Sequence, residues 1–572
     1  MDLGNCALTE IPKELQQLTH LKSLNLGSYY WDSKEGEYRE SSNSLSENMF
    51  PHVIDFSWEK LPNLHTLTLS NTKITDVSTV QHLSNLQKLD LSNTKITDVS
   101  ALQHLSNLQK LDLSHTEVTD VCSLEHLSNL QQLTLRNTKV TDVSALQHLS
   151  NLQQLDLSYT KVTDVSALQH LSNLQHLTLS DICLDRFPRQ LLFSPSMESI
   201  IWENGSLPVV PRETFSQSYD DSCLERLRDY YTTLEQHGSK TNLSVKLLLT
   251  GNGRVGKTSL VNRLLYNTFD ESEKSTDGII VKYWNDGVKV QNKPVQIQVW
   301  DFAGQDIYQA THRLFMRSKA IYLVMWDVES EKEPNHVYQE YTYQNYKLGY
   351  WLYHAQHLGQ GSPIIVVQNK IEKDGRQSQL YLPHFQEHYP IANQAEISCK
   401  ENEKNGFDLL IGIIQNVGEQ MSELQEKWPK PYLKVKGEIE KLQQQGIKQL
   451  TYEDYYELCE GVGLDQVSAS APDSLLHLLH HSGTVFYQQD LFHNQLILDQ
   501  QWAIDAVYTL FRRQDNTYRK LLEAKKGHFT IDDLEKPGRN SRLKNEHFSS
   551  PLWSPAVYAF ALLTATLINP CT

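Results

Sequence analysis

The sequence predicts a multidomain chain: a solenoid of short repeats, an α/β domain with a mostly parallel sheet, and a smaller α+β segment. Three observations predict this order. Leucines recur with a 22-residue period in the first third of the chain. Strand-like apolar runs alternate with helical stretches in the middle, which is typical of a sheet covered on both faces. Short helical and strand-like segments follow, before a tail without a clear pattern.

Composition excludes several classes of function. A length of 572 residues suggests about four domains. The net charge of −17 argues against binding to nucleic acid or to an anionic membrane. Seven scattered cysteines without a CxxC pair indicate free thiols in a reducing cytoplasm. No secretory signal is visible, and the longest apolar run, 557–568, is too short to span a bilayer. We therefore expect a cytoplasmic protein without a membrane span.

The repeats occupy residues 1–215. Each copy from Leu64 onward contains L-x-x-L-x-L, which is the pattern of a leucine-rich repeat. No single copy can bury its leucines, so stacked copies must share one core. The expected inward residues of one copy are Leu86, Leu89, Leu91, Ile96, Val99, Leu102 and Leu105. Thr replaces the usual Asn at positions 72, 94, 116, 138 and 160, and its hydroxyl can still bond to the turning backbone.

Two parts of the array depart from the repeat. Residues 27–60 are expected to form an irregular polar insertion. Residue 1 already lies inside a repeat and no N-terminal cap is evident, so we expect upstream sequence to be missing.

The side chains beside each middle leucine are expected to line a concave face. They are Thr66, Thr68, Lys88, Asp90, Lys110, Asp112, Gln132, Thr134, Gln154, Asp156, His176 and Thr178. Two interpretations stay open: a surface that binds protein partners, or a solvated face that keeps the array in solution. Aromatic residues, which dominate binding hot spots, are absent from this set. The insertion offers better anchors in Tyr29, Tyr30, Trp31 and Tyr38.

A linker helix is predicted within residues 216–243, and a nucleotide-binding domain within 244–427. The segment GNGRVGKT follows an apolar strand and precedes a helical stretch, which is the context of a phosphate-binding loop. Glycines let backbone N–H groups approach phosphate oxygens, and the helix start adds its positive dipole end. The residues expected to bind phosphate are Gly251, Asn252, Gly253, Arg254, Val255, Gly256, Lys257, Thr258 and Ser259.

Further motifs follow at expected strand ends and predict Mg²⁺ binding and hydrolysis. Thr258, Asp301 and Thr276 are the expected metal ligands, with Asp301 acting through water. The Gly304 N–H can sense a γ-phosphate, and Gln305 can orient the attacking water. Lys257, Gln305 and Thr276 are therefore the predicted catalytic residues.

A guanine base is expected at two later loops. In guanine-binding proteins, an acid at the fourth place of the first loop accepts hydrogen bonds from the base. Here that loop is Asn369-Lys370-Ile371-Glu372. Asn369 and the Lys370 stem help to hold the ring, and Ser398, Cys399 and Lys400 would back it.

The runs STDGI, WDFAGQDIYQATHRLFM and QNKIE resemble the Roc domain of the Roco family, a branch of the Ras-like GTPases. In that family, leucine-rich repeats precede Roc and a COR domain follows it. The resemblance covers about residues 1–535. It implies a Ras-like P-loop GTPase that uses Mg²⁺ with GTP or GDP. Two residues depart from the family: Glu372 replaces Asp, and Arg254 replaces a common Gly. Arg254 is either a surface charge, which we favour, or a cis arginine near the transferred phosphate.

The segments LTYEDYYELCEGVG, LLHLLHHSGTVFYQQD and LILDQQWAIDAVY resemble the first half of COR, at residues 428–537. Helices that end in a strand pair predict a winged-helix-like shape. The second half of COR, through which the family dimerises, has no counterpart, and residues 538–572 stay unassigned. Two explanations stay open: a longer natural protein, able to form a homodimer, or a different reading of the gene at this end.

The leading hypothesis is a Mg²⁺-dependent GTP-binding protein that hydrolyses GTP slowly without a partner. It would act as a signalling switch whose repeats recruit protein partners. The alternative is a repeat-based scaffold with a structural or non-cycling nucleotide. An ATP-driven oligomerising protein is disfavoured because Asn369 and Lys370 point to guanine.

Overall fold

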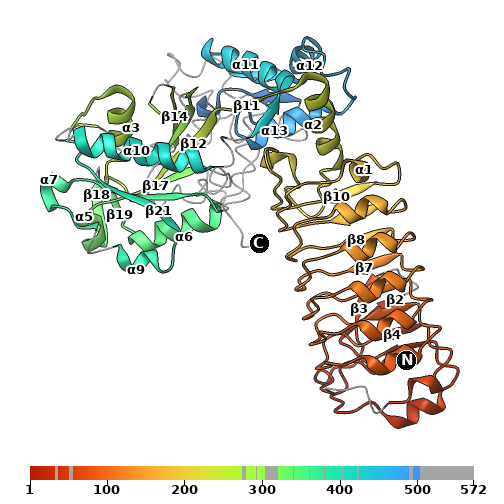
Figure 1. The fold of residues 1–572 in the computed structure, drawn as a ribbon. Coiled ribbons are helices and arrows are strands. Elements are labelled where there is room, and N and C mark those ends of the chain that lie inside the picture. Colours follow the sequence, from red (N-terminus) through yellow and green to blue (C-terminus); the bar gives the residue numbers. More distant parts are fainter. Residues whose placement is uncertain are drawn as a thin grey trace, which may run out of the picture. The chain divides into compact units, whose positions relative to one another are not determined.

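The chain folds into two compact units in the computed structural model (Figure 1). One unit contains Met1–Gln236 together with Val467–Ser474, and the other contains the rest of the chain. The structure describes residues 1–32, 37–50, 56–273, 279–285, 287–290, 293–302, 304, 320–338, 341–359, 361–378, 382–400, 404–421, 424, 426–487 and 494–502.

Leucine-rich repeats build the first unit, as the sequence predicted. One three-residue strand from each repeat joins a parallel sheet in the order β1-β4-β5-β6-β7-β8-β9-β10. The strands stack along the solenoid in Figure 1. They are β1 (Ser23–Asn25), β4 (Thr66–Thr68), β5 (Lys88–Asp90), β6 (Lys110–Asp112), β7 (Gln132–Thr134), β8 (Gln154–Asp156), β9 (His176–Thr178) and β10 (Ser199–Ile201).

Short 3-10 helices return the chain on the opposite side of the repeats. They are η1 (Lys13–Gln17), η2 (Trp58–Lys60), η3 (Ser78–His82), η4 (Ser100–His104), η5 (Cys122–His126), η6 (Ser144–His148), η7 (Ser166–His170) and η8 (Arg212–Thr214). The seven residues expected to point inward in one copy, five leucines with Ile96 and Val99, are all buried.

Repeated polar contacts hold each turn of the solenoid. The Thr94 hydroxyl, at the position usually held by Asn, donates to the Leu91 carbonyl at 2.6 Å. The Asp98 carboxylate accepts from the Ser100 N–H at 2.8 Å and so starts η4. Asn107 donates its amide to the Ser84 carbonyl of the preceding copy at 2.9 Å. The same three contacts recur along the array, so each copy fixes the geometry of the next.

The insertion is more regular than the sequence suggested. Strands β2 (Tyr29–Asp32) and β3 (Glu37–Glu40) pair as an antiparallel hairpin. Phe50, Phe56 and Trp58 are buried in the repeat core, and Phe56 and Trp58 contact edge to face. The prediction of an irregular polar insertion was therefore wrong for these parts, because three aromatic side chains anchor the segment to the solenoid.

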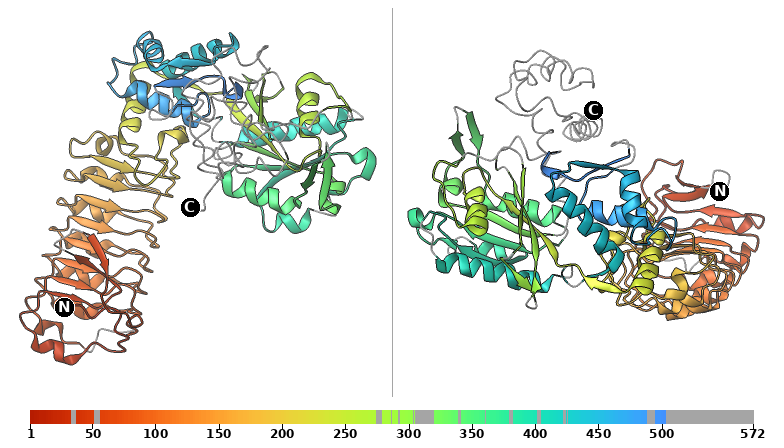
Figure 2. Two further views of the ribbon diagram at one scale, coloured as in Figure 1. Left: turned by 180° about the vertical axis from the view of Figure 1, so that it is seen from behind. Right: turned by 90° about the horizontal axis from the view of Figure 1, so that it is seen from above.

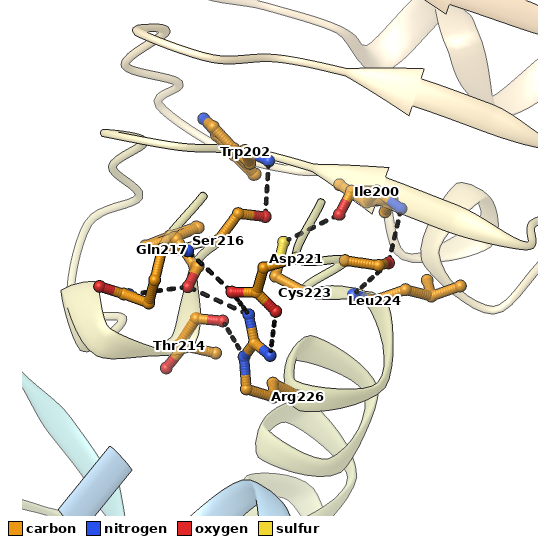
Figure 3. A network of polar contacts seen from close by, with 11 residues as sticks. Ile200, Trp202, Thr214, Ser216, Gln217, Asp221, Cys223, Leu224 and Arg226 are labelled. Atoms are coloured by element: carbon orange, nitrogen blue, oxygen red, sulfur yellow. Dashed lines mark hydrogen bonds and ion pairs between the residues drawn. The ribbon is translucent and has the colours of Figure 1, made fainter. Parts of the chain in front are cut away.

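A polar network closes the C-terminal end of the repeats (Figure 3). Arg226 binds both oxygens of Asp221, at 2.9 and 2.8 Å, and also donates to the carbonyls of Thr214 and Phe215. Cys223 donates its N–H to the Ile200 carbonyl at 2.9 Å. These contacts cover the edge of β10, which would otherwise expose unpaired backbone groups.

Two helices belong to this end of the solenoid: α1 (Arg189–Leu192) and α2 (Leu224–His237). Helix α2 lies inside the predicted linker, and it buries Leu224, Leu227 and Tyr230 in the repeat core. Asp229 on α2 is also buried and accepts hydroxyl hydrogen bonds from Ser470 and Ser474 at 2.9 and 2.5 Å. These bonds explain why residues 467–474 belong to the first unit.

A six-stranded sheet in the order β13-β16-β12-β17-β20-β21 forms the centre of the second unit. All neighbours are parallel except β13, an edge strand that is antiparallel to β16. The strands are β12 (Ser244–Thr250), β13 (Ile279–Trp284), β16 (Gln296–Phe302), β17 (Ile321–Trp326), β20 (Ile364–Gln368) and β21 (Ile391–Glu396).

Helices cover both faces of this sheet, in agreement with the α/β prediction (Figure 2). Helices α3 (Lys257–Tyr266) and α10 (Lys404–Gln420) pack on one face, and α6 (Leu348–Leu358) packs on the other. The remaining helices here are α5 (Val328–Lys332), α7 (Ile371–Asp374) and α9 (Pro383–Gln386). Two hairpins join them: β14 (Lys289–Val290) with β15 (Lys293–Pro294), and β18 (Asn335–Tyr338) with β19 (Tyr341–Gln344).

The last described part contains α11 (Lys430–Gln444), α12 (Tyr452–Glu460) and α13 (Ala471–His481). Strand β23 (Gln449–Thr451) pairs with β24 (Gln495–Ile497), and β11 (Ser239–Thr241) pairs with β22 (Lys427–Pro429). The Thr451 hydroxyl caps α12 by accepting from the Asp454 N–H, which leaves Leu450 in β23.

No helix among the described ranges is long and apolar enough to cross a membrane.

Candidate nucleotide-binding site

The loop between β12 and α3 requires glycine at two points. Gly251 and Gly256 have φ values of +140° and +93°, which L side chains rarely adopt. A Cβ at Gly251 would lie 2.2 Å from the Met325 carbonyl oxygen, and one at Gly256 would lie 2.2 Å from Asn369 Nδ2. The loop is therefore packed against β17 and against the predicted base loop, and its shape depends on both neighbours.

Lys257 lies at the start of α3 with its ammonium group enclosed by the loop. Its Nζ donates to the carbonyls of Gly251 and Asn252 at 2.8 and 2.7 Å, and only 6% of the residue is exposed. Burial lowers the pKa of this ammonium to about 8, although the charges of Asp301 and Asp327 act in the opposite direction. A cation is thus positioned inside the loop where phosphate oxygens would approach.

Asn252 fixes the loop to a distant segment, a role that the sequence did not reveal. Its buried amide donates to the Tyr346 carbonyl at 2.7 Å and accepts from the Tyr346 N–H at 2.8 Å. The Trp351 indole donates to the same amide oxygen at 3.1 Å. These bonds span about a hundred residues of sequence, so no local pattern could have predicted them.

Thr258 and Asp301 meet at the end of β16. The Thr258 hydroxyl donates to Asp301 Oδ2 at 2.6 Å, and Asp301 is buried. A hydroxyl and a carboxylate are oxygen ligands of the kind that Mg²⁺ prefers. Two of the three predicted metal ligands are therefore adjacent. The third, Thr276, lies outside the described residues, as does the predicted catalytic Gln305.

The predicted base loops are joined by one side chain. Asn369 donates to the Val255 carbonyl at 2.9 Å and accepts from the Cys399 N–H at 3.1 Å. It thus connects the phosphate loop to the segment Ser398-Cys399-Lys400. Cys399 packs in the core of the sheet, and this burial raises the pKa of its thiol to about 12, which disfavours the reactive thiolate.

Two cations, Lys370 and Arg263, make contacts that fix the predicted base loops. Lys370 has a φ of +64° and forms an ion pair with the buried Asp327 carboxylate at 2.5 Å. Arg263 on α3 donates to the carbonyls of Cys399 and Lys400 at 2.8 and 3.2 Å. No motif in the sequence pointed to Arg263, because an arginine on a helix is usually a solvated surface charge.

A cleft of about 900 Å³ opens over these residues. Its walls include most of the predicted positions: Gly253, Arg254, Gly256, Lys257, Thr258, Ser259, Gly304, Asn369, Lys370, Glu372, Cys399 and Lys400. Glu372 is exposed at this wall, on α7. The predicted phosphate, metal and base residues thus surround one cavity in the second unit.

The concave face of the repeats is a second candidate surface. The twelve predicted positions line a groove of about 430 Å³. Asp90, on β5 of this face, is buried, and burial together with the charge of Asp112 raises its pKa to about 7. Tyr159 and Tyr219 add exposed aromatic rings beside Arg136, which lies 4.6 Å from the centre of the Tyr159 ring.

Family models match three parts of the chain. The model for the Ras of Complex, Roc, domain of DAPkinase matches residues 246–372. The model for the C-terminal of Roc, COR-A domain matches residues 429–549. Leucine-rich-repeat models match residues 62–104, 106–148 and 128–184. The chain has the domain combination of the Roco family. Its Roc domain is a Ras-like GTPase domain, which agrees with the parallel sheet and its phosphate loop.

Individual proteins also resemble this chain. A Roc-COR-CHAT protease from an unknown prokaryotic organism is 25% identical over 57% of this chain and 31% of its own length. Human Ras-related protein Rab-9B is 31% identical over 24% of this chain and 65% of its own length. Methanosarcina barkeri Roco2 RocCORdC bound to GDP superposes with a TM-score of 0.46 at 27% identity, covering 59% of this chain and 94% of that chain. The chain spans less than two thirds of the length of these curated relatives.

Replacement of Asp90 by Asn is predicted to remove a pH dependence of the repeats. The folded state holds a proton on Asp90 up to about pH 7, whereas the unfolded chain releases it near its ordinary pKa of 3.8. The folded state therefore binds more protons between these values, and stability is full below pH 4 and falls as pH rises through 7. We expect the free energy of unfolding to fall by about 1–3 kcal/mol between pH 5 and pH 8.

Thermal unfolding at pH 5 and pH 8 measures this effect. Asp90→Asn should be more stable than the parent chain at both pH values, and its advantage should be about 1–3 kcal/mol larger at pH 8 than at pH 5. Asp98→Asn, which changes an exposed turn aspartate, is the control and should change both values little. An equal shift of Asp90→Asn at both pH values would contradict the prediction.

Proposed function

We propose that this Roco protein binds GTP and GDP with Mg²⁺, hydrolyses GTP, and works as a nucleotide-controlled switch. The observation that carries the proposal is the shared cleft. Lys257, the Thr258–Asp301 pair and the Asn369 clamp line it or border it, at the places where phosphate, metal and base would lie.

Phosphate binding in this proposal depends on Lys257 and on the backbone N–H groups of residues 251–259. The ammonium group now bonds to two loop carbonyls, and phosphate oxygens would replace or share these partners. The N-terminus of α3 adds the positive end of its dipole. Thr258 and Asp301 would hold Mg²⁺, which neutralises charge on the β- and γ-phosphates when bound.

Guanine recognition is proposed for the other end of the cleft. The Glu372 carboxylate would accept the N1–H and the exocyclic N–H₂ of the base, a pattern that adenine cannot supply. Lys370, held by Asp327, would pack its stem against the ring, and the Ser398-Cys399-Lys400 segment would back it. Arg263 supports this segment through its carbonyls, so it acts as a positioning residue.

Hydrolysis in this proposal needs groups on both sides of the γ-phosphate. Gln305 and Thr276 would orient the attacking water, while Lys257 stabilises charge that moves toward the leaving oxygen. We expect turnover to be slow without a partner that supplies more positive charge.

COR-A contacts the Roc sheet at a point suited to reporting the nucleotide state. The Gln501 amide accepts from the Val281 N–H at 3.0 Å and donates to the Ile279 carbonyl at 2.9 Å. Both partners lie on the edge strand β13, directly after the segment that contains Thr276. We propose that Gln501 transmits the nucleotide state from β13 to COR-A, and that the repeats recruit protein partners.

Thermal stability with nucleotides tests the site directly. Mg²⁺ with GTP or GDP should stabilise the second unit by about 2.7 kcal/mol at a hundredfold the dissociation constant, whereas ATP should not. Lys257→Ala should abolish the shift, and Lys373→Ala, on the same wall of the cleft, should keep it. Near-normal GTP affinity in Lys257→Ala would reject the assignment.

Glu372→Asp is predicted to improve discrimination between GTP and ATP by roughly tenfold, because a shorter carboxylate restores the family geometry. Displacement of a bound fluorescent guanine nucleotide by GTP and by ATP measures the ratio of the two affinities. Glu329→Asp serves as a control, since Glu329 lines the same cleft but pairs with Lys373. An unchanged ratio would show that Glu372 does not contact the base.

Gln501→Ala is predicted to release the edge of β13. Amide hydrogen exchange at Val281 should become about tenfold faster, because the variant loses both hydrogen bonds. It should also lose the difference in exchange between the GTP- and GDP-bound states. Gln500→Ala is a matched control, since that amide donates within COR-A to the Gly483 carbonyl. Unchanged protection of Val281 would exclude this contact as the link.

A further inference from the structure

The β18–β19 hairpin lies next to the phosphate loop, although nothing in the sequence motifs pointed to it. His336 on β18 is opposite Tyr343 on β19, and their rings stack with centroids 5.5 Å apart and planes 24° apart. The hairpin is also anchored on both sides. Asp327, which caps α5 before it, pairs with Lys370, and Tyr346 after it is bonded to Asn252.

The ring of His336 faces the third residue of the phosphate loop. A Cβ added at Gly253 would lie 2.9 Å from His336 Nε2 and 3.0 Å from Cε1. Arg254, the next loop residue, also contacts the hairpin, because its guanidinium donates to the Val337 carbonyl at 3.5 Å. The hairpin and the loop are therefore in contact at Gly253 and Arg254.

Gly253 also contacts the segment that follows β16. A Cβ at Gly304 would lie only 2.2 Å from the Gly253 N atom and 2.3 Å from the Asn252 carbonyl carbon. The Gly304 N–H is the group proposed to sense the γ-phosphate. His336, Gly253 and Gly304 thus converge at the end of the loop where the terminal phosphate of GTP would lie.

Hydrogen bonds determine which ring nitrogen of His336 carries a proton in the neutral ring. The Asn345 amide nitrogen donates to the Glu333 carbonyl at 2.9 Å, so its oxygen is the atom that lies 2.7 Å from His336 Nδ1. Nδ1 must then carry a proton and donate it to Asn345. A second proton on the ring can only reside on Nε2, the atom that faces Gly253, and it makes the ring a cation.

We infer that His336 is a catalytic residue for GTP hydrolysis, whose imidazolium donates its Nε2–H to an oxygen of the terminal phosphate. This inference rests on the proposed function. The His336 imidazolium would supply, from the same chain, a positive charge of the kind that stabilises phosphoryl transfer beside the terminal phosphate. The Arg254 guanidinium and the Tyr343 phenol are the titratable groups from the loop and from β19 that pack with this part of β18.

The reaction balances without consuming the imidazolium. The water oxygen bonds to the γ-phosphorus while the bond to the β–γ bridging oxygen breaks, and that electron pair leaves with GDP. The water proton ends on inorganic phosphate or in solvent. His336 keeps its proton throughout and only stabilises the charge on the phosphate oxygens, which is greatest in the transition state.

Single-turnover hydrolysis of bound GTP tests the inference in the full chain. Equilibrium binding of GTP and GDP is measured first on each variant, so failure of the proposed function appears as absent guanine binding in the parent chain. Where binding is present, His336→Ala should keep GDP affinity within about threefold and lose about 10- to 100-fold in the hydrolysis rate. His357→Ala, an exposed histidine on α6, should hydrolyse GTP like the parent chain.

Two further variants distinguish a role of the His336 charge from a role of the side chain's shape. His336→Arg keeps a cation at every pH, so it should hydrolyse GTP faster than His336→Ala. His336→Gln keeps a polar side chain without charge and should be slow, and it replaces His336→Ala if that variant unfolds. A parent-like rate in His336→Ala or His336→Gln would overturn the inference. Equal loss in His336→Arg and His336→Ala would overturn it as well, because the role would then be one of shape.

Discussion

The enclosed ammonium group of Lys257 is the constraint on which the second unit depends. Burying a cation is costly unless hydrogen bonds surround it, and the carbonyls of Gly251 and Asn252 provide two of them. That geometry requires a backbone that folds back over α3, which in turn requires positive φ values at Gly251 and Gly256. The parallel sheet then places this strained turn at the carboxyl end of its central strand, the usual position of ligand loops in such folds.

Two buried asparagines hold the loop in that shape from opposite sides. Asn252 bonds to Tyr346 and Trp351, and Asn369 bonds to the Val255 carbonyl and the Cys399 N–H. An amide left without partners at such depth costs about 1–3 kcal/mol, so neither side chain can be replaced without disturbing the loop. The base end and the phosphate end of the site are consequently one connected structure.

The sequence predicted what short-range patterns encode. A 22-residue period determines the solenoid, and a strand followed by GNGRVGKT determines the phosphate loop, so the domain order and the Roco resemblance were correct. It did not predict contacts between residues far apart in the chain, such as those of Asn252, Arg263 and His336. It also missed the anchoring of the insertion by Trp58, since an aromatic residue in an irregular polar stretch carries no periodic signal.

Strand β12 connects the nucleotide site to COR-A physically. The loop with Lys257 follows one end of this seven-residue strand, and Ser244 at the other end accepts from Lys436 Nζ of helix α11 at 2.8 Å. Lys436 is also buried, and burial lowers its pKa, so this contact is a fixed part of the core. Gln501 provides a different kind of contact, because it bonds to an edge strand that has only one sheet neighbour. An edge strand can move without breaking the central sheet. The Lys436 contact thus joins α11 to a central strand of the Roc sheet, whereas the Gln501 contact joins COR-A to its edge strand, the position at which the proposed switch would respond to the nucleotide.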